Sequence, residues 1–312
     1  ITDFAIETIK NFDREKPFCL LYFHKAPHRN WMPDSKHLTM YDGVEIPMPE
    51  TFFDDYQTRS NAARDQDMEV INLYNSSDMK IHSIGKEEEY SGGNEAFRMK
   101  ASENWQRLYN SLTNEQRKSW DAAYEPKNRA FLEANLSGIE LAKWKYQRYI
   151  KDYLRCVASV DDNIGRLLDY LDEHELTENT VVIYTSDQGF YLGEHGWYDK
   201  RFMYEESLGM PLIIRYPQEI SAGMTLDEMV LNLDFCPTIL DYAGVEVPAE
   251  IQGESLRSLL RGHPSPQWRQ MIYYHYYEYP HGWHDVKRHY GIRTQKFKLI
   301  HFYDDIDAKE LY

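Results

Sequence analysis

The stretch that decides the fold of this chain is Val181-Val-Ile-Tyr-Thr-Ser-Asp187-Gln-Gly-Phe-Tyr-Leu-Gly-Glu-His195-Gly-Trp-Tyr-Asp199-Lys-Arg201. Its β-branched start predicts a strand that is buried on both faces and ends in polar residues, at the edge where open α/β sheets bind ligands. Asp187 and Gln188 offer hard oxygen donors there, which suit Ca²⁺ or Mg²⁺ better than zinc. Lys200, on the loop beyond, could bring a positive charge to an anion beside that metal. An isolated Ser-Asp-Gln-Gly is also typical of a helix cap or turn.

Two further segments carry a recognisable pattern. Pro17–Phe23 predicts a second buried strand, which runs into the polar segment His24–Pro33. Asn232–Pro248 predicts a helix and a turn, and it begins with N-L-D-F-C-P-T. Together with T-S-D-Q-G, G-E-H-G and D-K-R in the first stretch, these segments resemble the sulfatase family of the alkaline phosphatase superfamily. The resemblance extends from the first residues of the chain to the last.

The resemblance implies a hydrolase that cleaves sulfate esters with a formylglycine nucleophile bound to Ca²⁺, with Mg²⁺ as the alternative metal. Asp187 and Gln188 match metal ligands of the family. Lys200 matches the lysine that binds the sulfate and the leaving oxygen. His28 matches a histidine that donates a hydrogen bond to the sulfate, and His24 is the alternative for this role. Negative charge on the sulfate oxygens must meet donors already in place, so we expect Lys200 and His28 to be catalytic.

The nucleophile motif of the family, C-x-P-x-R or S-x-P-x-R, does not occur in this sequence. Cys19, Cys156 and Cys236 lack the required Pro and Arg, and each is most simply a small buried hydrophobic residue. Two further metal-binding aspartates of the family have no match either. We therefore expect formylglycine and these aspartates to lie upstream of Ile1, in a sulfatase of which this chain is a piece that lacks the N-terminal part and a short C-terminal end.

Three segments are similar to segments of bacterial sulfatases that act on 6-O-sulfated N-acetylglucosamine in glycosaminoglycans or mucin: His24–Trp31, Trp197–Ser207 and Tyr273–Pro280. Asp199 and Arg201 flank Lys200 and have the capacity to bind hydroxyl groups, and His284 offers a further polar tip. His195 has two equal alternatives, a contact with substrate or a hydrogen bond that orders the loop. We expect Asp199, Arg201, His284 and His195 to bind the substrate, although each could instead be structural.

The composition limits the partners of the chain. Its net charge of −16 argues against nucleic acid, because phosphate binding needs a basic surface. Residues 268–301 reverse this sign locally, with six Lys or Arg and five His against Glu278 and Asp285, and such a cluster can attract an anion. We expect a sulfated glycan as the partner. No apolar run reaches the roughly 18 residues of a membrane span, and the resemblance implies a periplasmic or extracellular location.

Periodicity and the resemblance together predict an α/β fold. Residues 1–262 should hold a mixed, mostly parallel sheet sandwiched by helices, with a helical and loop excursion at 58–142 and a long helix at 143–175. Residues 263–312 should form a small, incomplete antiparallel-sheet subdomain with a covering helix. Its predicted strands are Met271–Tyr277, Tyr290–Thr294 and Phe297–Tyr303.

Two other functions fit part of the pattern. A phosphoesterase or phosphonate hydrolase of the same superfamily would share Asp187, but a zinc form needs further histidine ligands, for which His28 and His195 are candidates. A non-catalytic relative that binds sulfated glycans would account for the missing nucleophile. The sequence upstream of Ile1 separates these functions. Other hydrolase classes lack support, because neither G-x-S-x-G nor H-E-x-x-H occurs.

The missing nucleophile motif generates a first prediction. The purified 312-residue chain should show no sulfatase turnover and only weak calcium binding, because it lacks the nucleophile and part of the metal ligand set. Release of sulfate from a sulfated sugar and from an aryl sulfate measures the first property, and calorimetry with Ca²⁺ measures the second. Robust hydrolysis by this chain alone would contradict the prediction.

Overall fold

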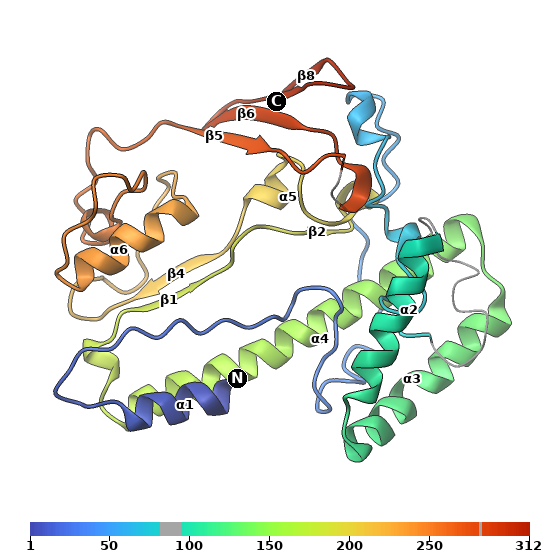
Figure 1. Cartoon of the computed structure of the whole chain (residues 1–312), viewed down its shortest axis with the longest axis horizontal. Coiled ribbons are helices and arrows are strands. Elements are labelled where there is room, and N and C mark those ends of the chain that lie inside the picture. Colours follow the sequence, from blue (N-terminus) through green and yellow to red (C-terminus); the bar gives the residue numbers. More distant parts are fainter. Residues whose placement is uncertain (82–94, 281–282) are drawn as a thin grey trace. The chain divides into compact units, whose positions relative to one another are not determined.

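The computed structural model describes residues 1–81, 95–280 and 283–312 (Figure 1), without the side chains of residues 95–98 and 283. The chain forms two compact units. Unit 1 comprises residues 1–55, 67–173 and 191–198, and unit 2 comprises residues 56–66, 174–190 and 199–312. The division at residue 262 remains a prediction. Among the described helices, none is both long enough and apolar enough to cross a membrane.

Unit 1 is built on a long helix, α4 (Gly138–Glu173), which confirms the helix predicted at 143–175. Helix α1 lies along α4 (Figure 1), and Thr2 Oγ1 donates to Asn163 Oδ1 at 2.7 Å. In the excursion predicted at 58–142, helix α3 begins with a capping box, in which the Gln116 amide donates to Thr113 Oγ1 at 3.2 Å. Residues 82–94 of that excursion lie outside the described part. The other helices of unit 1 are α1 (Thr2–Asn11), α2 (Glu95–Asn110) and α3 (Asn114–Ala134).

One face of α4 carries charged residues into the interior of unit 1. Asp152 is fully buried, and its carboxylate accepts hydrogen bonds from Lys80 Nζ at 2.8 Å and Tyr124 Oη at 2.6 Å. Arg155 Nη1 adds a third bond at 2.7 Å. Burial alone would raise the pKa of Asp152, but the charges of Lys80, Arg148 and Arg155 lower it below its ordinary value. Because a buried charge is stable only when it is paired, this network fixes α4 against α3 and the Lys80 loop.

Unit 2 contains the strand of the Val181–Arg201 stretch. Strand β1 pairs antiparallel with β4, and Thr185 lies opposite Leu212. In the described part of the chain, the pairs β1–β4, β5–β6, β6–β7 and β7–β8 are all antiparallel, so none of them shows the parallel pairing expected for the main sheet. The elements up to residue 260 are β1 (Val182–Thr185), β2 (Tyr191–Leu192), β3 (Tyr198–Asp199), α5 (Glu205–Leu208), β4 (Leu212–Arg215), α6 (Phe235–Tyr242) and α7 (Arg257–Leu260), of which β2 and part of β3 belong to unit 1.

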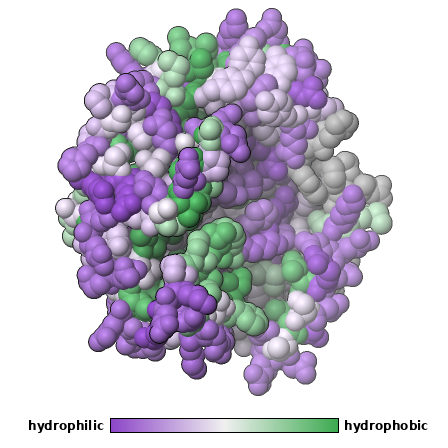
Figure 2. Space-filling model, turned by 60° about the vertical axis from the view of Figure 1, so that its left-hand side comes forward, coloured by the Kyte–Doolittle hydropathy of each residue, from purple (hydrophilic) through white to green (hydrophobic). Residues whose placement is uncertain are grey.

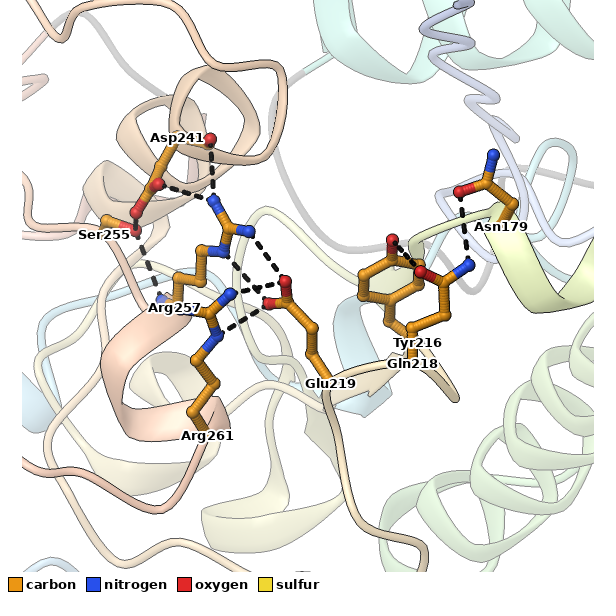
Figure 3. A network of polar contacts seen from close by, with 8 residues as sticks. All are labelled: Asn179, Tyr216, Gln218, Glu219, Asp241, Ser255, Arg257 and Arg261. Atoms are coloured by element: carbon orange, nitrogen blue, oxygen red, sulfur yellow. Dashed lines mark hydrogen bonds and ion pairs between the residues drawn. The ribbon is translucent and has the colours of Figure 1, made fainter.

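A carboxylate clamp holds α6 and α7 to the turn that follows β4. Figure 3 shows Glu219 beside two arginines, Arg257 at the start of α7 and Arg261 directly after its end. Glu219 accepts bonds from Arg257 Nη2 at 2.7 Å and from Arg261 Nε at 2.9 Å. These bonds lower the pKa of Glu219 to about 2. Arg257 Nη1 also donates to Asp241 Oδ1 at 3.0 Å, so one guanidinium connects both helices to the turn.

Asp234, in the N-L-D part of the Asn232–Pro248 segment, has a structural role. It is fully buried and accepts bonds from the amides of Leu231 at 2.8 Å and Glu254 at 2.9 Å. Arg269 adds a bidentate pair, with Nη1 at 2.5 Å and Nη2 at 2.7 Å. A single carboxylate therefore satisfies donors from three separate segments of unit 2.

The C-terminal part of unit 2 is a four-stranded antiparallel sheet in the order β5-β6-β7-β8, which confirms the predicted sheet (Figure 1). Its buried face packs on Phe202, whose ring centroid is 6.1 Å from that of Phe302. Among the described residues after Leu260 there is no α-helix, so the covering helix is not part of this sheet. The strands are β5 (Met271–Tyr276), β6 (His289–Thr294), β7 (Lys298–Phe302) and β8 (Ala308–Leu311).

Several apolar runs are more exposed than predicted. Residues 17–23 form no strand, and Leu21 and Phe23 are 62% and 76% exposed. In β1, Tyr184 is 40% exposed and the other three residues are only half-buried, so the prediction of burial on both faces is wrong. Figure 2 shows hydrophobic residues that reach the surface between hydrophilic ones. An apolar run becomes a buried strand only where other elements cover both faces, and in the described sheet β1 has β4 as its single neighbour.

The three cysteines differ from one another. Cys156, on α4, is buried as predicted, and burial raises the pKa of its thiol to about 12. Cys19 and Cys236 are exposed, so the prediction of burial is wrong for both. Cys19 belongs to the uncovered 17–23 segment, and Cys236 lies in the first turn of α6, on its exposed side.

The buried Asp234 cluster generates a second prediction. Asp234→Ala should lower the free energy of unfolding by about 3–5 kcal/mol, the scale found when one partner of a buried ion pair is removed. The control is Asp227→Ala, an exposed aspartate that should change stability by less than about 0.5 kcal/mol. Urea unfolding of the chain measures both values, and equal stability of the two variants would contradict the structural role of Asp234.

Candidate functional site

The candidate site in unit 2 is centred on Asp199, the last residue of β3. Its carboxylate is 10% exposed, and Oδ2 lies 2.6 Å from Arg201 Nη1 and 2.8 Å from His284 Nε2. Lys200 Nζ lies 3.2 Å from the other oxygen, Oδ1. Three residues that are adjacent in sequence thus meet His284, which comes from a distant turn. One nearly buried carboxylate thus contacts the other three side chains of the cluster.

The electrostatics of this cluster favour a permanently ionised Asp199. Burial alone would raise the pKa of Asp199, but the hydrogen bond from His284 and the charges of Arg201 and Lys200 lower it far below its ordinary value. Burial alone would also lower the pKa of Arg201, and the Asp199 carboxylate reverses this and raises it. The two groups therefore stay charged at neutral pH and keep each other in place.

The backbone of this cluster is strained. The φ angles of Asp199, Arg201 and His284 are +74°, +112° and +77°, all in the left-handed region that residues with side chains rarely adopt. Such strain costs of order 1–3 kcal/mol per residue and is found mainly at functional sites. The ion pairs and hydrogen bonds on Asp199 oppose this cost. Strain concentrated in three residues of one cluster supports a functional role.

Lys200 is the cation of the cluster with the most exposed side chain, at 21%. Its ammonium lies 5.8 Å from the centroid of the Phe190 ring and 3.2 Å from Asp199. An ammonium group has three donors, so contact with one carboxylate oxygen leaves donor capacity for an anionic ligand.

Asp187 and Gln188 follow β1 and fit a hard cation in the chemistry of their donors. The Asp187 carboxylate is exposed and accepts one long bond, from Ser186 Oγ at 3.4 Å. Asn232 Nδ2 donates to the Asp187 carbonyl, also at 3.4 Å. A carboxylate and an amide oxygen are ligands that Ca²⁺ and Mg²⁺ accept, although Ca²⁺ takes six to eight oxygens. Within the described residues, no cluster of three or more His, Cys, Asp or Glu could hold a metal.

The glycine of D-Q-G has a packing function. A Cβ atom on Gly189 would lie 2.2 Å from the Glu206 carbonyl oxygen and 2.3 Å from that of Gly209. The Gly189 amide also donates to the Ser207 carbonyl at 2.8 Å. Only glycine permits this approach, which anchors the residues after Asp187 and Gln188 to the 206–209 segment of unit 2.

His28 lies in unit 1 and is exposed. Its Nδ1 is 2.7 Å from the carbonyl oxygen of Arg29 and must carry a proton to donate there. The other ring nitrogen is then a donor only when the imidazole is doubly protonated. With Nδ1 bonded to this carbonyl, Nε2 is the ring nitrogen that remains for a ligand.

His195 also lies in unit 1, where its contacts order a loop. Its Nδ1 is 2.9 Å from Asp54 Oδ2, and its amide donates to Thr51 Oγ1 at 3.2 Å. The ring is buried, with Trp197 at a centroid distance of 5.4 Å. These contacts support the loop-ordering alternative, and a substrate contact remains a prediction. Asp54 was not foreseen, because nothing in the local sequence connects it to His195.

The basic segment at 268–301 does not form a surface of unpaired cations that could attract an anion. Most of its cations are paired with carboxylates of unit 2, several of them outside the segment. These pairs are Arg269–Asp234, Lys287–Asp285, Arg288–Asp304, Arg293–Glu205 and Lys298–Glu205. The segment therefore cross-links unit 2, and the expectation that it attracts an anion is not supported by this arrangement.

Comparison with known proteins gives the family. The model of the family described as "Sulfatase" matches residues 1–245, and that described as "N-sulphoglucosamine sulphohydrolase, C-terminal" matches residues 193–312. The chain therefore belongs to the sulfatase family. This confirms the fold class predicted from the sequence, an α/β fold with a C-terminal antiparallel sheet.

Two curated relatives and one solved structure illustrate the similarity. The chain is 50% identical to an N-acetylglucosamine-6-O-sulfatase of Bacteroides thetaiotaomicron over 315 residues, which cover 100% of this chain and 54% of that protein. It is 37% identical to human N-acetylglucosamine-6-sulfatase over 120 residues, 38% of this chain and 22% of that protein. The structure of BT4656 in complex with its substrate D-glucosamine-2-N,6-O-disulfate has a TM-score of 0.90 at 50% identity, over 100% of this chain and 61% of that one. The chain thus spans about half the length of its Bacteroides relative.

The lowered pKa of Asp199 generates a third prediction. Asp199→Asn should destabilise the chain by about 3 kcal/mol at pH 7, because it leaves two cations without their carboxylate. A depressed pKa contributes stability above the unfolded value, about 3.9 for Asp, and loses it as the pH falls through the lower folded value. The difference between wild type and variant should therefore be constant from about pH 7 to 5 and shrink below about pH 4.

Urea unfolding at several pH values measures this difference. The control is Asp187→Asn, which makes the same chemical change at an exposed aspartate and should shift stability by less than about 0.5 kcal/mol. A pH-independent difference for Asp199→Asn would show that its carboxylate does not carry the stabilisation.

Proposed function

We propose that the whole protein is a sulfuric ester hydrolase that removes 6-O-sulfate from N-acetylglucosamine in glycosaminoglycan or mucin glycans. The observation that carries this proposal is the Asp199 cluster, which presents the Lys200 ammonium and the Arg201 guanidinium beside each other from a rigid turn. Its support is the 50% identity, over the whole chain, to a protein named for this activity.

In the proposed reaction, Lys200 binds a sulfate oxygen and meets the negative charge on the leaving oxygen. Asp199 holds the Lys200 ammonium at 3.2 Å before substrate arrives, so no reorganisation is needed as charge develops. His28, whose Nδ1 bonds the Arg29 carbonyl, is the proposed hydrogen-bond donor to the sulfate from unit 1. Lys200 thus acts as a donor that is already in place when the oxyanion forms.

The metal we propose is calcium, held in part by Asp187 and Gln188 at the end of β1. The exposed carboxylate of Asp187, with its one long hydrogen bond, is available for a cation. A bound Ca²⁺ would supply Lewis-acid stabilisation of negative charge. Formylglycine is the proposed nucleophile, and none of the three cysteines of this chain has the motif that forms it.

Recognition of the sugar falls to Asp199, Arg201 and His284. A carboxylate accepts bonds from hydroxyl groups, and a guanidinium or imidazole donates them. Because Arg201 and His284 both contact Asp199 Oδ2, a single carboxylate orients two candidate sugar-binding groups. Remote contacts of this kind use binding energy to favour one glycan over another.

The other functions considered have weaker support. The family models and the Bacteroides relative are named for sulfatases, which does not favour a phosphoesterase, a phosphonate hydrolase or a non-catalytic glycan-binding protein. A periplasmic or extracellular location remains part of the proposal. The net charge of −16 argues against nucleic acid as a partner.

The fourth prediction tests the function in a chimera in which this chain replaces the segment it matches in the Bacteroides relative. Lys200→Ala should lower turnover by roughly 10²–10³, the cost of one charge-stabilising donor, on 6-O-sulfated N-acetylglucosamine and on an aryl sulfate alike. Arg201→Ala should lower the activity on the sulfated sugar far more than the activity on the aryl sulfate, because only the sugar makes contacts remote from the cleaved sulfate. Asp187→Ala should weaken calcium binding in calorimetry as well as the rate.

Lys296→Ala is the matched control, since it removes an exposed lysine of unit 2 far along the chain from Lys200. It should leave both rates unchanged. Near-normal turnover of Lys200→Ala and Asp187→Ala at saturating calcium would place the site elsewhere. Equal losses of Arg201→Ala on both substrates would remove Arg201 from sugar recognition.

A further inference from the structure

Arg201 lies between two carboxylates, of which the second has no role in the proposed reaction. Its Nη1 is 2.6 Å from Asp199 Oδ2, and its Nε is 3.5 Å from Glu278 Oε2. Glu278 follows β5, and its side chain is 46% exposed, whereas that of Asp199 is 10% exposed. The guanidinium therefore faces one buried and one accessible negative charge.

The Glu278 carboxylate is oriented and not free to leave. Tyr276 Oη donates to Glu278 Oε2 at 2.8 Å, the same oxygen that faces Arg201. Burial, together with this bond, raises the pKa of Tyr276, so its hydroxyl remains a donor at neutral pH. The last residues of β5 thus hold a negative charge beside Arg201.

Arg201 is equally fixed through its backbone. Tyr274 Oη donates to the Arg201 carbonyl at 2.9 Å, and the Arg201 amide donates to Ser207 Oγ at 3.1 Å. Burial raises the pKa of Tyr274 to about 12, which keeps this phenol protonated. With both peptide groups bound and φ at +112°, the backbone of Arg201 is held in place beside its two carboxylates.

The charge balance differs between the two neighbouring cations. Lys200 has one carboxylate within 4 Å in the described structure, Asp199, which it shares with Arg201. Arg201 has both Asp199 and Glu278. A second anion beside Arg201 would be repelled by Glu278, a charge that Lys200 does not face, whereas an uncharged hydroxyl can accept from the guanidinium and donate to one of the two carboxylates.

We propose that Glu278 is a selectivity residue that makes the Arg201 position accept sugar hydroxyl groups and reject a second sulfate or carboxylate. This inference rests on the proposed function and deepens it. The substrate class is a sugar with one sulfate at the Lys200 position and free hydroxyl groups at the Arg201 position. A glycan that carries a further sulfate on those hydroxyls is a poor substrate until a different sulfatase has removed that sulfate.

The test compares two substrates in the chimera, 6-O-sulfated and 3,6-di-O-sulfated N-acetylglucosamine. Glu278→Gln keeps the shape of the side chain and removes its charge. The ratio of kcat/KM for the disulfated over the monosulfated sugar should rise by about tenfold, the size of one weak like-charge repulsion. The change should lie in KM, because the repulsion acts on binding and not on the sulfate that is cleaved.

Three control variants isolate the charge of Glu278. Glu246→Gln removes the same charge from an exposed residue of unit 2 and should leave the ratio unchanged. Tyr276→Phe loosens the carboxylate without removing it and should change the ratio far less than Glu278→Gln. Glu278→Asp restores the charge and should restore most of the discrimination, and thermal unfolding checks that all variants are folded.

An unchanged ratio in Glu278→Gln, or an equal rise in Glu246→Gln, would overturn the inference while leaving the sulfatase proposal intact. A chimera that hydrolyses no sulfated sugar overturns the proposed function instead. In that case calorimetry of the two sugars with the 312-residue chain and its Glu278→Gln variant decides the selectivity by itself. Equal dissociation constants for both sugars in wild type and variant would contradict it.

Discussion

The buried carboxylate of Asp199 is the constraint on which the candidate site depends. Two adjacent residues, Lys200 and Arg201, would repel each other and point away into solvent without a shared counter-ion. Asp199 draws both toward one point and adds His284 on the same oxygen as Arg201. These contacts offset the strain of left-handed backbone at Asp199, Arg201 and His284. The site is therefore rigid before any ligand arrives.

The same physical device recurs in the scaffold. Asp152 in unit 1 and Asp234 in unit 2 are fully buried, and each accepts bonds from cations and other donors on separate segments. This explains how a chain with a net charge of −16 can hold many cations inside. Five of the six arginines and lysines at 268–301 likewise form ion pairs with carboxylates. Lys200, with one carboxylate oxygen at 3.2 Å, keeps donor capacity for an anion.

The proposed metal ligands contrast with this rigidity. Asp187 is exposed and weakly bonded, as a carboxylate that awaits a cation would be. The residue that fixes its surroundings is Gly189, whose lack of a Cβ allows the backbone at 206–209 to approach. The short D-Q-G segment thus combines an accessible metal-ligand candidate, Asp187, with a close backbone contact at Gly189. Glycine is necessary there for packing and not for a positive φ, since its φ is not among the positive values.

Local sequence determined what depends on neighbours along the chain. Helical periodicity predicted α4, segments rich in aromatic residues predicted β5, β6 and β7, and adjacency placed Asp199 beside Lys200 and Arg201. Tertiary structure alone decided which distant groups complete the site, because no periodic signal connects residues far apart. It brought His284 to Asp199 across 85 positions, Glu278 to Arg201, and Asp54 to His195 across 141. It also decided burial: the apolar runs at 17–23 and in β1 and β4 stayed partly exposed, because a strand is buried only where other elements cover its faces.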